Sequence, residues 1–135
     1  MDDIILLVDA EVNPTESEDK VKKAVENIFG NIQITTKPQR KGSLLVAEAR
    51  GNEPLTKFYN LLSREHIRAA ARTVLVAGMY RNVVSFCLNK QAAFAGHVSF
   101  AEETAESPLG PIRVRIESSN PRELIDWLTR MAVRG

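Results

Sequence analysis

The sequence has few of the residues that build disulfides, metal centres or membrane spans. Its 135 residues include one cysteine, Cys87, and two histidines. One cysteine excludes an intramolecular disulfide and any multi-thiolate metal site. The apolar run within residues 4–12 is far shorter than the roughly 20 residues that span a bilayer, and acidic residues precede it where a signal peptide carries positive charge. We therefore expect a cytoplasmic protein without a membrane contact, metal or cofactor.

Catalytic motifs are also scarce. Ser63 and His66 lie three residues apart in a helical pattern, but no third group is placed to orient the histidine. Glu102, Glu103 and Glu106 have neither histidines at ligand spacing nor a calcium-loop pattern, which indicates a solvated acidic loop. A glycine loop of the kind that cradles phosphates is missing as well. We expect that the protein is not an enzyme.

The composition is that of one globular domain, 1–135. With 44% hydrophobic and 26% charged residues, a chain of this length can remove roughly two-thirds of its unfolded surface from water. The net charge of +1 is unevenly placed, because residues 31–100 carry ten basic and three acidic groups. This excess favours a polyanion partner if the basic groups converge in space, and a neutral surface if the segments mix.

Hydrophobic periodicity predicts alternating strands and helices. A T-x-x-E pattern at Thr15 and Glu18 predicts a capping box that begins the first helix, and Asn120 followed by Pro121 predicts the start of the last, with Leu124, Leu128 and Met131 facing inward. The segment from Pro54 to Ala77 reads as one broken helix or as two. The expected strands are 4–12, 32–36, 43–49, 83–88, 97–100 and 112–117.

These elements predict an α+β fold of two layers, a mainly antiparallel sheet with helices packed on one face. The first and last helices each have one apolar stripe, so both are expected on the same sheet face. Apolar residues assigned to the other face leave a patch that needs a cover, and a homodimer is the simplest one. The residues assigned to that patch are Ile5, Leu7, Leu45 and Ala47.

Two groups of basic residues are candidate phosphate contacts. Arg64, Arg68 and Arg72 recur every fourth residue, which predicts an arginine edge along a helix. Ordinary pairing with nearby acids is the alternative for these three. The predicted turn between two strands carries the second group, Lys37, Arg40 and Lys41. Arg113 and Arg115 are expected instead to pair with Asp9 and Glu11 across the sheet.

The stretch Asn89, Lys90 and Gln91 follows a predicted strand and admits two interpretations. Its amide and ammonium groups could grip a phosphate or a base edge. Alternatively, Asn89 caps a short helix, Gln91 closes backbone hydrogen bonds and Lys90 is solvated. We expect Asn89 to form a local cap and Lys90 to be exposed beside the arginine helix.

Several blocks occur in an order that resembles a known family. They are "EVNPTESEDKV", "LNKQAA", "GHVSF", "PLGPIRV" and "IDWL". Together they are similar to the archaeal uncharacterised protein family two-zero-one, across essentially the whole chain. That resemblance implies a place in the superfamily of the fifth large-subunit ribosomal protein fold, whose namesake binds ribosomal RNA. It therefore implies a two-layer α+β fold and RNA as a partner.

The expected function is a non-catalytic RNA-binding or RNA-associated module. Its candidate contacts are the nine basic and amide residues named above: Arg64, Arg68, Arg72, Lys90, Asn89, Gln91, Lys37, Arg40 and Lys41. The alternative is a structural or assembly protein, a homodimer whose basic groups pair internally and which binds no nucleic acid.

Overall fold

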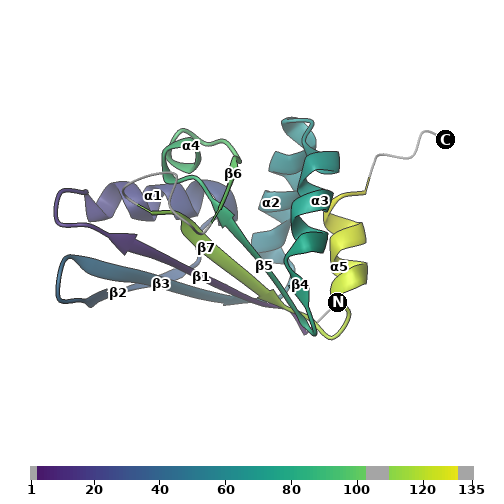
Figure 1. The fold of residues 1–135 in the computed structure, drawn as a ribbon, viewed down its shortest axis with the longest axis horizontal. Helices are drawn as coiled ribbons and strands as arrows, with labels where there is room; N and C mark the ends of the chain where they lie inside the picture. The colour runs from purple at the N-terminus through teal and green to yellow at the C-terminus, as the bar shows by residue number, and fades with distance from the viewer. Residues whose placement is uncertain (1–2, 103–109, 131–135) are drawn as a thin grey trace.

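The computed structural model describes residues 3–102 and 110–130, which form one antiparallel sheet and a layer of helices (Figure 1). The sheet order is β2-β3-β1-β7-β5-β4, and the short β6 also pairs with β5. The strands are β1 (Ile5–Val12), β2 (Gln33–Pro38), β3 (Ser43–Arg50), β4 (Met79–Tyr80), β5 (Val83–Leu88), β6 (Phe100–Ala101) and β7 (Ile112–Glu117). The helices are α1 (Glu18–Phe29), α2 (Glu53–Arg64), α3 (Arg68–Ala77), α4 (Lys90–Phe94) and α5 (Pro121–Leu128).

All these helices lie on one face of the sheet, so the predicted two-layer α+β class is confirmed (Figure 1). The first and last helices share that face, as expected. The other face, which no described helix covers, is called the open face below. Each strand therefore alternates between core and open positions, since successive side chains point to opposite sides of a strand.

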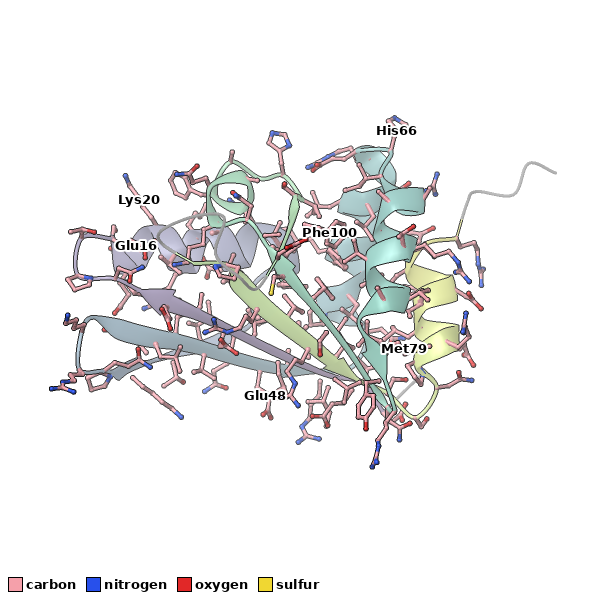
Figure 2. The ribbon with its side chains drawn as sticks, in the orientation of Figure 1. Glu16, Lys20, Glu48, His66, Met79 and Phe100 are labelled. Atoms are coloured by element: carbon pink, nitrogen blue, oxygen red, sulfur yellow. The ribbon has the colours of Figure 1, made fainter. Side chains whose placement is uncertain are left out.

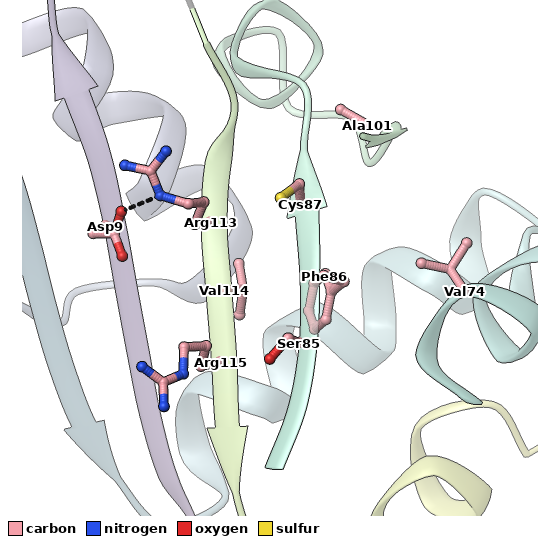
Figure 3. Close-up of a pocket in the computed structure, with 9 residues that line it drawn as sticks. All are labelled: Asp9, Val74, Ser85, Phe86, Cys87, Ala101, Arg113, Val114 and Arg115. Carbon is pink, nitrogen blue, oxygen red and sulfur yellow. Dashed lines mark hydrogen bonds and ion pairs between the residues drawn. The ribbon is translucent and has the colours of Figure 1, made fainter. Parts of the chain in front are cut away.

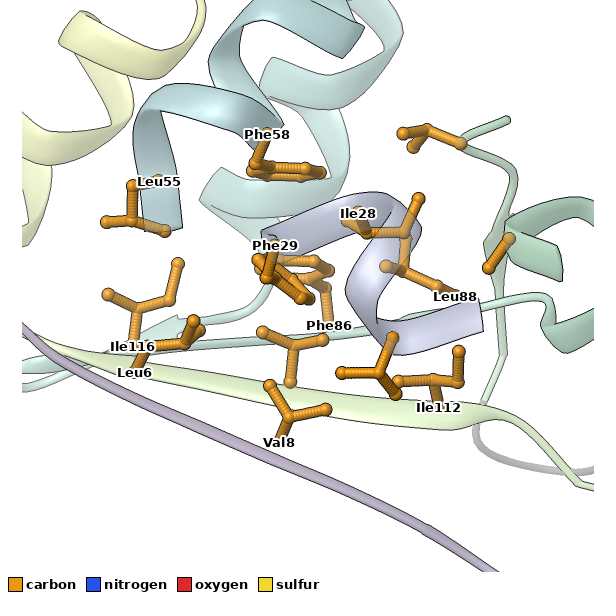
Figure 4. Close-up of a cluster of buried hydrophobic side chains, with 14 of the residues drawn as sticks. Leu6, Val8, Ile28, Phe29, Leu55, Phe58, Phe86, Leu88, Ile112 and Ile116 are labelled. Carbon is orange, nitrogen blue, oxygen red and sulfur yellow. The ribbon is translucent and has the colours of Figure 1, made fainter. Parts of the chain in front are cut away.

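The core lies between the sheet and the helices, and aromatic rings join the two layers (Figure 4). Phe58 of α2 lies between Phe29 of α1 and Phe86 of β5, with ring centroids 5.6 and 5.5 Å away. Such pairs add about 0.5–1.5 kcal/mol beyond the area they bury. Phe58 is fully buried, so this contact fixes α1 and α2 against the sheet.

The register of β3 corrects the assignment of the open face. Leu45 pairs with Ala10 and Ala47 pairs with Val8, and all four side chains lie in the core. The apolar residues that β3 presents on the open face are Leu44 and Val46 instead. Because β3 is apolar at consecutive positions, periodicity could not choose between its two faces.

The first helix begins two residues later than a Thr15 cap requires. Ser17 is the N-cap, and its Oγ accepts a hydrogen bond from the backbone N–H of Lys20 at 3.4 Å. The residues before it form a turn in which Glu16 N–H donates to the carbonyl of Asn13. The predicted capping box of Thr15 and Glu18 is therefore wrong, because Thr15 lies inside this turn and the helix begins only after it.

The segment 54–77 consists of two helices. His66 has φ 57°, a left-handed conformation that ends α2, and the N–H of Ile67 donates to the carbonyl of Leu62. α3 then starts at Arg68 without a side-chain cap. Arg64 lies on α2 while Arg68 and Arg72 lie on α3. The predicted arginine edge along one helix is therefore wrong.

The cap of α5 is as expected. The Asn120 Oδ1 accepts from the Glu123 N–H at 3.1 Å, and the Asn120 Nδ2 donates to the Glu123 carboxylate at 3.1 Å. Leu124 and Leu128 face the core, whereas Met131 and the acidic residues Glu103 and Glu106 lie outside the described residues. Within 3–102 and 110–130, no helix is long and apolar enough to cross a bilayer.

Candidate functional site

Lys90 is buried, contrary to the expectation that it is solvated. Its side chain is 8% exposed, and its Nζ donates to the Glu16 carboxylate at 3.1 Å and to the backbone carbonyl of Glu11. These contacts tie the start of α4 to the end of β1 and to the turn before α1. Neither interpretation of this residue predicted a buried ion pair, because its partners lie more than 70 residues away in the chain.

Glu16 is the anionic partner of Lys90 in this ion pair. Burial raises the pKa of its carboxyl. The hydrogen bonds from the backbone and side chain of Asn13 and from Lys90 lower this pKa by more than burial raises it, so the net pKa lies below its ordinary value. The Asn13 Nδ2 lies 2.7 Å from the Glu16 Oε1. The carboxylate is therefore favoured in its charged form, and the Lys90 ammonium is engaged within the fold.

The two amides of the same stretch differ. The Asn89 Oδ1 accepts from the Ala92 N–H at 2.9 Å, which confirms the predicted cap of α4. Gln91 is exposed, and among the described contacts its side chain closes no backbone hydrogen bond. Of this stretch, Gln91 is the residue whose side chain is exposed.

Two of the three candidate arginines are engaged within the fold. Arg72 Nη1 lies 2.7 Å from Asp126 Oδ1 and 3.2 Å from Thr129 Oγ1, so it joins α3 to α5. Arg68 donates to the carbonyl of Arg130 at 2.9 Å. Arg64 is exposed near the end of α2. The structure therefore favours the alternative, pairing with an acid, for Arg72, while Arg68 is held by a backbone carbonyl.

The open face carries one short ion pair, between Asp9 and Arg113 (Figure 3). These residues are directly opposite in the β1–β7 register, and the Arg113 Nε lies 2.6 Å from the Asp9 Oδ1. This contact confirms the pairing expected for Arg113. Arg115 stands opposite Leu7 rather than Glu11, so the expected pairing of Arg115 with Glu11 is wrong.

The tip of the β2–β3 hairpin carries three exposed cations. We call residues 37–42 the hairpin tip; its cations Lys37, Arg40 and Lys41 are all exposed, and none forms an ion pair with a described residue. Gly42 has φ 80°, and a Cβ there would lie 2.1 Å from the carbonyl oxygen of Val12. The tip is therefore packed against the end of β1, and only glycine fits at that contact.

A surface pocket between α1 and α4, here called the α1–α4 pocket, was not predicted from the sequence. It has a volume of about 430 Å³, and its lining includes Ser17, Lys20, Gln91 and Phe94. Phe94 is 45% exposed, and Lys20 Nζ lies 5.8 Å from the centroid of its ring. Figure 2 shows Lys20 and Glu16 at the end of α1 where the β2–β3 hairpin also ends. The three-residue spacing of Gln91 and Phe94, which places both on one side of a helix, is the sequence pattern that could have indicated this pocket.

The basic segment 31–100 does not form one patch. Most of its cations divide among the hairpin tip, the α2–α3 junction and the β4–β5 turn, which lie at different ends of the molecule (Figure 1), while Arg50 ends β3 and Lys57 lies within α2. Lys90 is buried, and Arg72 is paired. The exposed and unpaired cations that remain together are those of the hairpin tip.

Comparison with known proteins identifies the family. The sequence model of a family described as RNA binding matches residues 6–118. A UPF0201 protein of Sulfurisphaera tokodaii is 42% identical over 130 residues, covering 96% of this chain and 90% of that protein. A UPF0201 protein of Pyrobaculum islandicum is 43% identical over 126 residues, covering 93% and 88%.

Solved structures agree. A crystal structure of a UPF0201 protein from Methanococcus jannaschii has a TM-score of 0.83 and 31% identity, over 96% of this chain and 95% of that chain. A DUF54 protein from Methanothermobacter thermautotrophicus has a TM-score of 0.64 at 16% identity, over 93% and 95%, and so shares the fold. The class is thus an α+β protein of a family described as RNA binding. The chain belongs to the UPF0201 family, the family that its sequence blocks resemble.

Proposed function

We propose that this protein is a non-catalytic RNA-binding module that contacts phosphates with the hairpin tip. The observation that carries the proposal is the exposure of Lys37, Arg40 and Lys41 at one end of the β2–β3 hairpin, without ion pairs to described residues. Cations that are free of acidic partners displace the counterions condensed on RNA when they meet its phosphates, and this release drives association. The family's description as RNA binding supports the same partner.

The open face is a poor platform for stacked bases. On β1 and β3 this face carries Leu7, Leu44 and Val46, which alternate with acidic residues, and the ion pair of Asp9 and Arg113 lies beside Val46. RNA-binding sheets stack unpaired bases on aromatic side chains. The described strands present no aromatic residue at the centre of this face. The proposed contact is therefore made by the end of the molecule and not by the sheet surface.

The number of phosphates contacted predicts how strongly RNA binding depends on salt. Three cations at the tip contact about three phosphates, so the logarithm of affinity should fall against the logarithm of salt with a slope of about 2 to 3. The exposed acid Glu11 lies nearby on β1 and weakens the local field. We therefore expect weak binding without sequence preference from the tip alone.

A salt titration of RNA binding tests the proposal. The variant Lys37→Ala/Arg40→Ala/Lys41→Ala should bind a structured RNA more weakly and flatten the salt slope to near zero. The variant Arg64→Ala/Arg115→Ala/Arg122→Ala removes the same charge from exposed positions elsewhere and is the matched control. If both variants lose the same RNA affinity, net charge alone explains the binding and the hairpin tip is not the contact. A wild type that binds no RNA at low salt would also reject the proposal.

The open face favours a second candidate function, assembly into a homodimer. Leu7, Leu44 and Val46 are half-buried on this face, with no described helix over them, although the register places an acidic residue opposite each one. A second copy would cover them if the interface buries about 1,000 Å² or more. Sedimentation velocity at micromolar concentration should then give a dimer, which Val46→Lys dissociates. A monomeric wild type would end this candidate.

A further inference from the structure

We propose that the α1–α4 pocket binds one unpaired nucleotide of an RNA by stacking its base on Phe94. This inference rests on the proposed function, which it deepens by adding a second kind of contact. The pocket and the hairpin tip lie at the same end of the molecule, since α1 begins where the β2–β3 hairpin ends (Figure 1). One strand of RNA that leaves a structured region could therefore reach both.

The exposed ring is the first observation. Phe94 and Tyr80 are the large hydrophobic side chains exposed in the part of the chain that the structure describes. Phe94 alone of the two lines the α1–α4 pocket, where part of its ring meets solvent. An aromatic ring open to solvent beside a pocket offers a flat face to a base, and stacking of this kind accepts any base.

The backbone that carries the ring is held in place. The Asn27 Nδ2 on α1 donates to the carbonyls of Ala93 at 3.0 Å and Phe94 at 2.9 Å. Lys90 holds the other end of α4 through its buried pair with Glu16. A binding group that is already ordered loses little conformational entropy when its ligand arrives.

Polar groups around the ring suit a nucleotide. Gln91 lies three residues before Phe94 on α4, hence on the same side of the helix, and its exposed amide can both donate and accept. Lys20 is exposed, and its ammonium lies over the ring. A base that replaces this ammonium leaves Lys20 free to pair with the phosphate of the same nucleotide. Glu16, the acid in the lining, is already neutralised by Lys90.

Fluorescence anisotropy with two labelled RNAs tests the pocket. The probes are a single-stranded oligouridylate and a blunt duplex of equal length. Phe94→Ala should weaken single-strand binding by about 5- to 150-fold, the loss of one stacked base, and leave duplex binding and its salt slope unchanged. Phe94→Trp should restore single-strand binding. Tyr80→Ala is the matched control, because Tyr80 is also exposed with a cation, Arg81, over its ring, and it should change neither.

The outcomes separate the two proposals. The hairpin-tip variant should weaken both RNAs, whereas Phe94→Ala should weaken only the single strand. If both RNAs bind and Phe94→Ala changes neither, or weakens both equally, the pocket inference is overturned and the proposed function stands. If neither RNA binds, the proposed function fails, and nuclear magnetic resonance decides the pocket separately: millimolar adenosine monophosphate should shift the amides of Gln91 and Phe94, and unshifted amides would overturn the inference.

Discussion

The ammonium of Lys90 and the carboxylate of Glu16 lie 3.1 Å apart, with side chains that are 8% and 11% exposed. The same ammonium donates to the backbone carbonyl of Glu11. Three segments meet there: the end of β1, the turn before α1 and the start of α4. Charges withdrawn from water in this way stabilise a fold only as a pair, because either partner left alone keeps its desolvation penalty.

Replacing Lys90 should therefore destabilise the protein strongly. Lys90→Ala leaves Glu16 and the Glu11 carbonyl without their donor and should lower the free energy of unfolding by about 3 kcal/mol. Lys57→Ala is the control, since Lys57 is exposed and also donates to a backbone carbonyl, that of Glu26, at 3.0 Å. Its loss should cost about 1 kcal/mol or less. Urea denaturation measures both, and equal losses would contradict the burial of Lys90.

The same pair predicts how stability depends on pH. The folded-state pKa of Glu16 lies below its ordinary value of 4.5, so its contribution is fully present above that pH and is lost as the pH falls through the lower folded pKa. Glu16→Gln removes this titration. Wild type should exceed Glu16→Gln in stability at pH 7, and the difference should shrink below pH about 4.5. Urea denaturation at several pH values tests this, and a difference that stays constant down to pH 2 would contradict it.

The Asn89 cap predicts a smaller loss than Lys90. Asn89→Ala removes the oxygen that accepts from the Ala92 N–H and should cost about 1 kcal/mol. Asn89→Asp keeps an acceptor at that position and should cost less. Thermal or urea denaturation of the two variants beside Lys90→Ala gives the order. If Asn89→Ala costs as much as Lys90→Ala, the short helix contributes more to the fold than one cap explains.

Local patterns predicted the layers of this fold because their causes are local. Alternation in β1 places Leu6 and Val8 in the core, and the Asn120 cap depends on a residue three positions away. The face of β3 was predicted wrongly, because both of its faces are apolar and only pairing with β1 decides between them. The start of α1 was displaced because Glu16 is bound by Asn13 and Lys90.

The candidate site was less predictable, since exposure and pairing depend on contacts between distant segments. The spacing of Arg68 and Arg72 indicates a helix edge, but Asp126, which takes up Arg72, comes from α5. Lys90 and Gln91 are neighbours in sequence, yet one is buried and the other exposed. The hairpin tip was predicted well because a short loop between two strands projects into solvent wherever the hairpin packs.

A substitution at Arg72 tests whether this residue has a structural role or an RNA-binding one. Its ion pair with Asp126 is half-exposed, so Arg72→Ala should lower the free energy of unfolding by roughly 1 kcal/mol, part of it through the lost bond to Thr129. Because the side chain is occupied by α5, the variant should keep the wild-type slope of RNA affinity against salt. The hairpin-tip variant should do the reverse, keeping stability within about 0.5 kcal/mol while flattening that slope. Urea denaturation and a salt titration of the two variants measure both quantities. A flattened slope in Arg72→Ala with unchanged stability would return α3 to the RNA-contacting surface and remove the hairpin tip from its leading place.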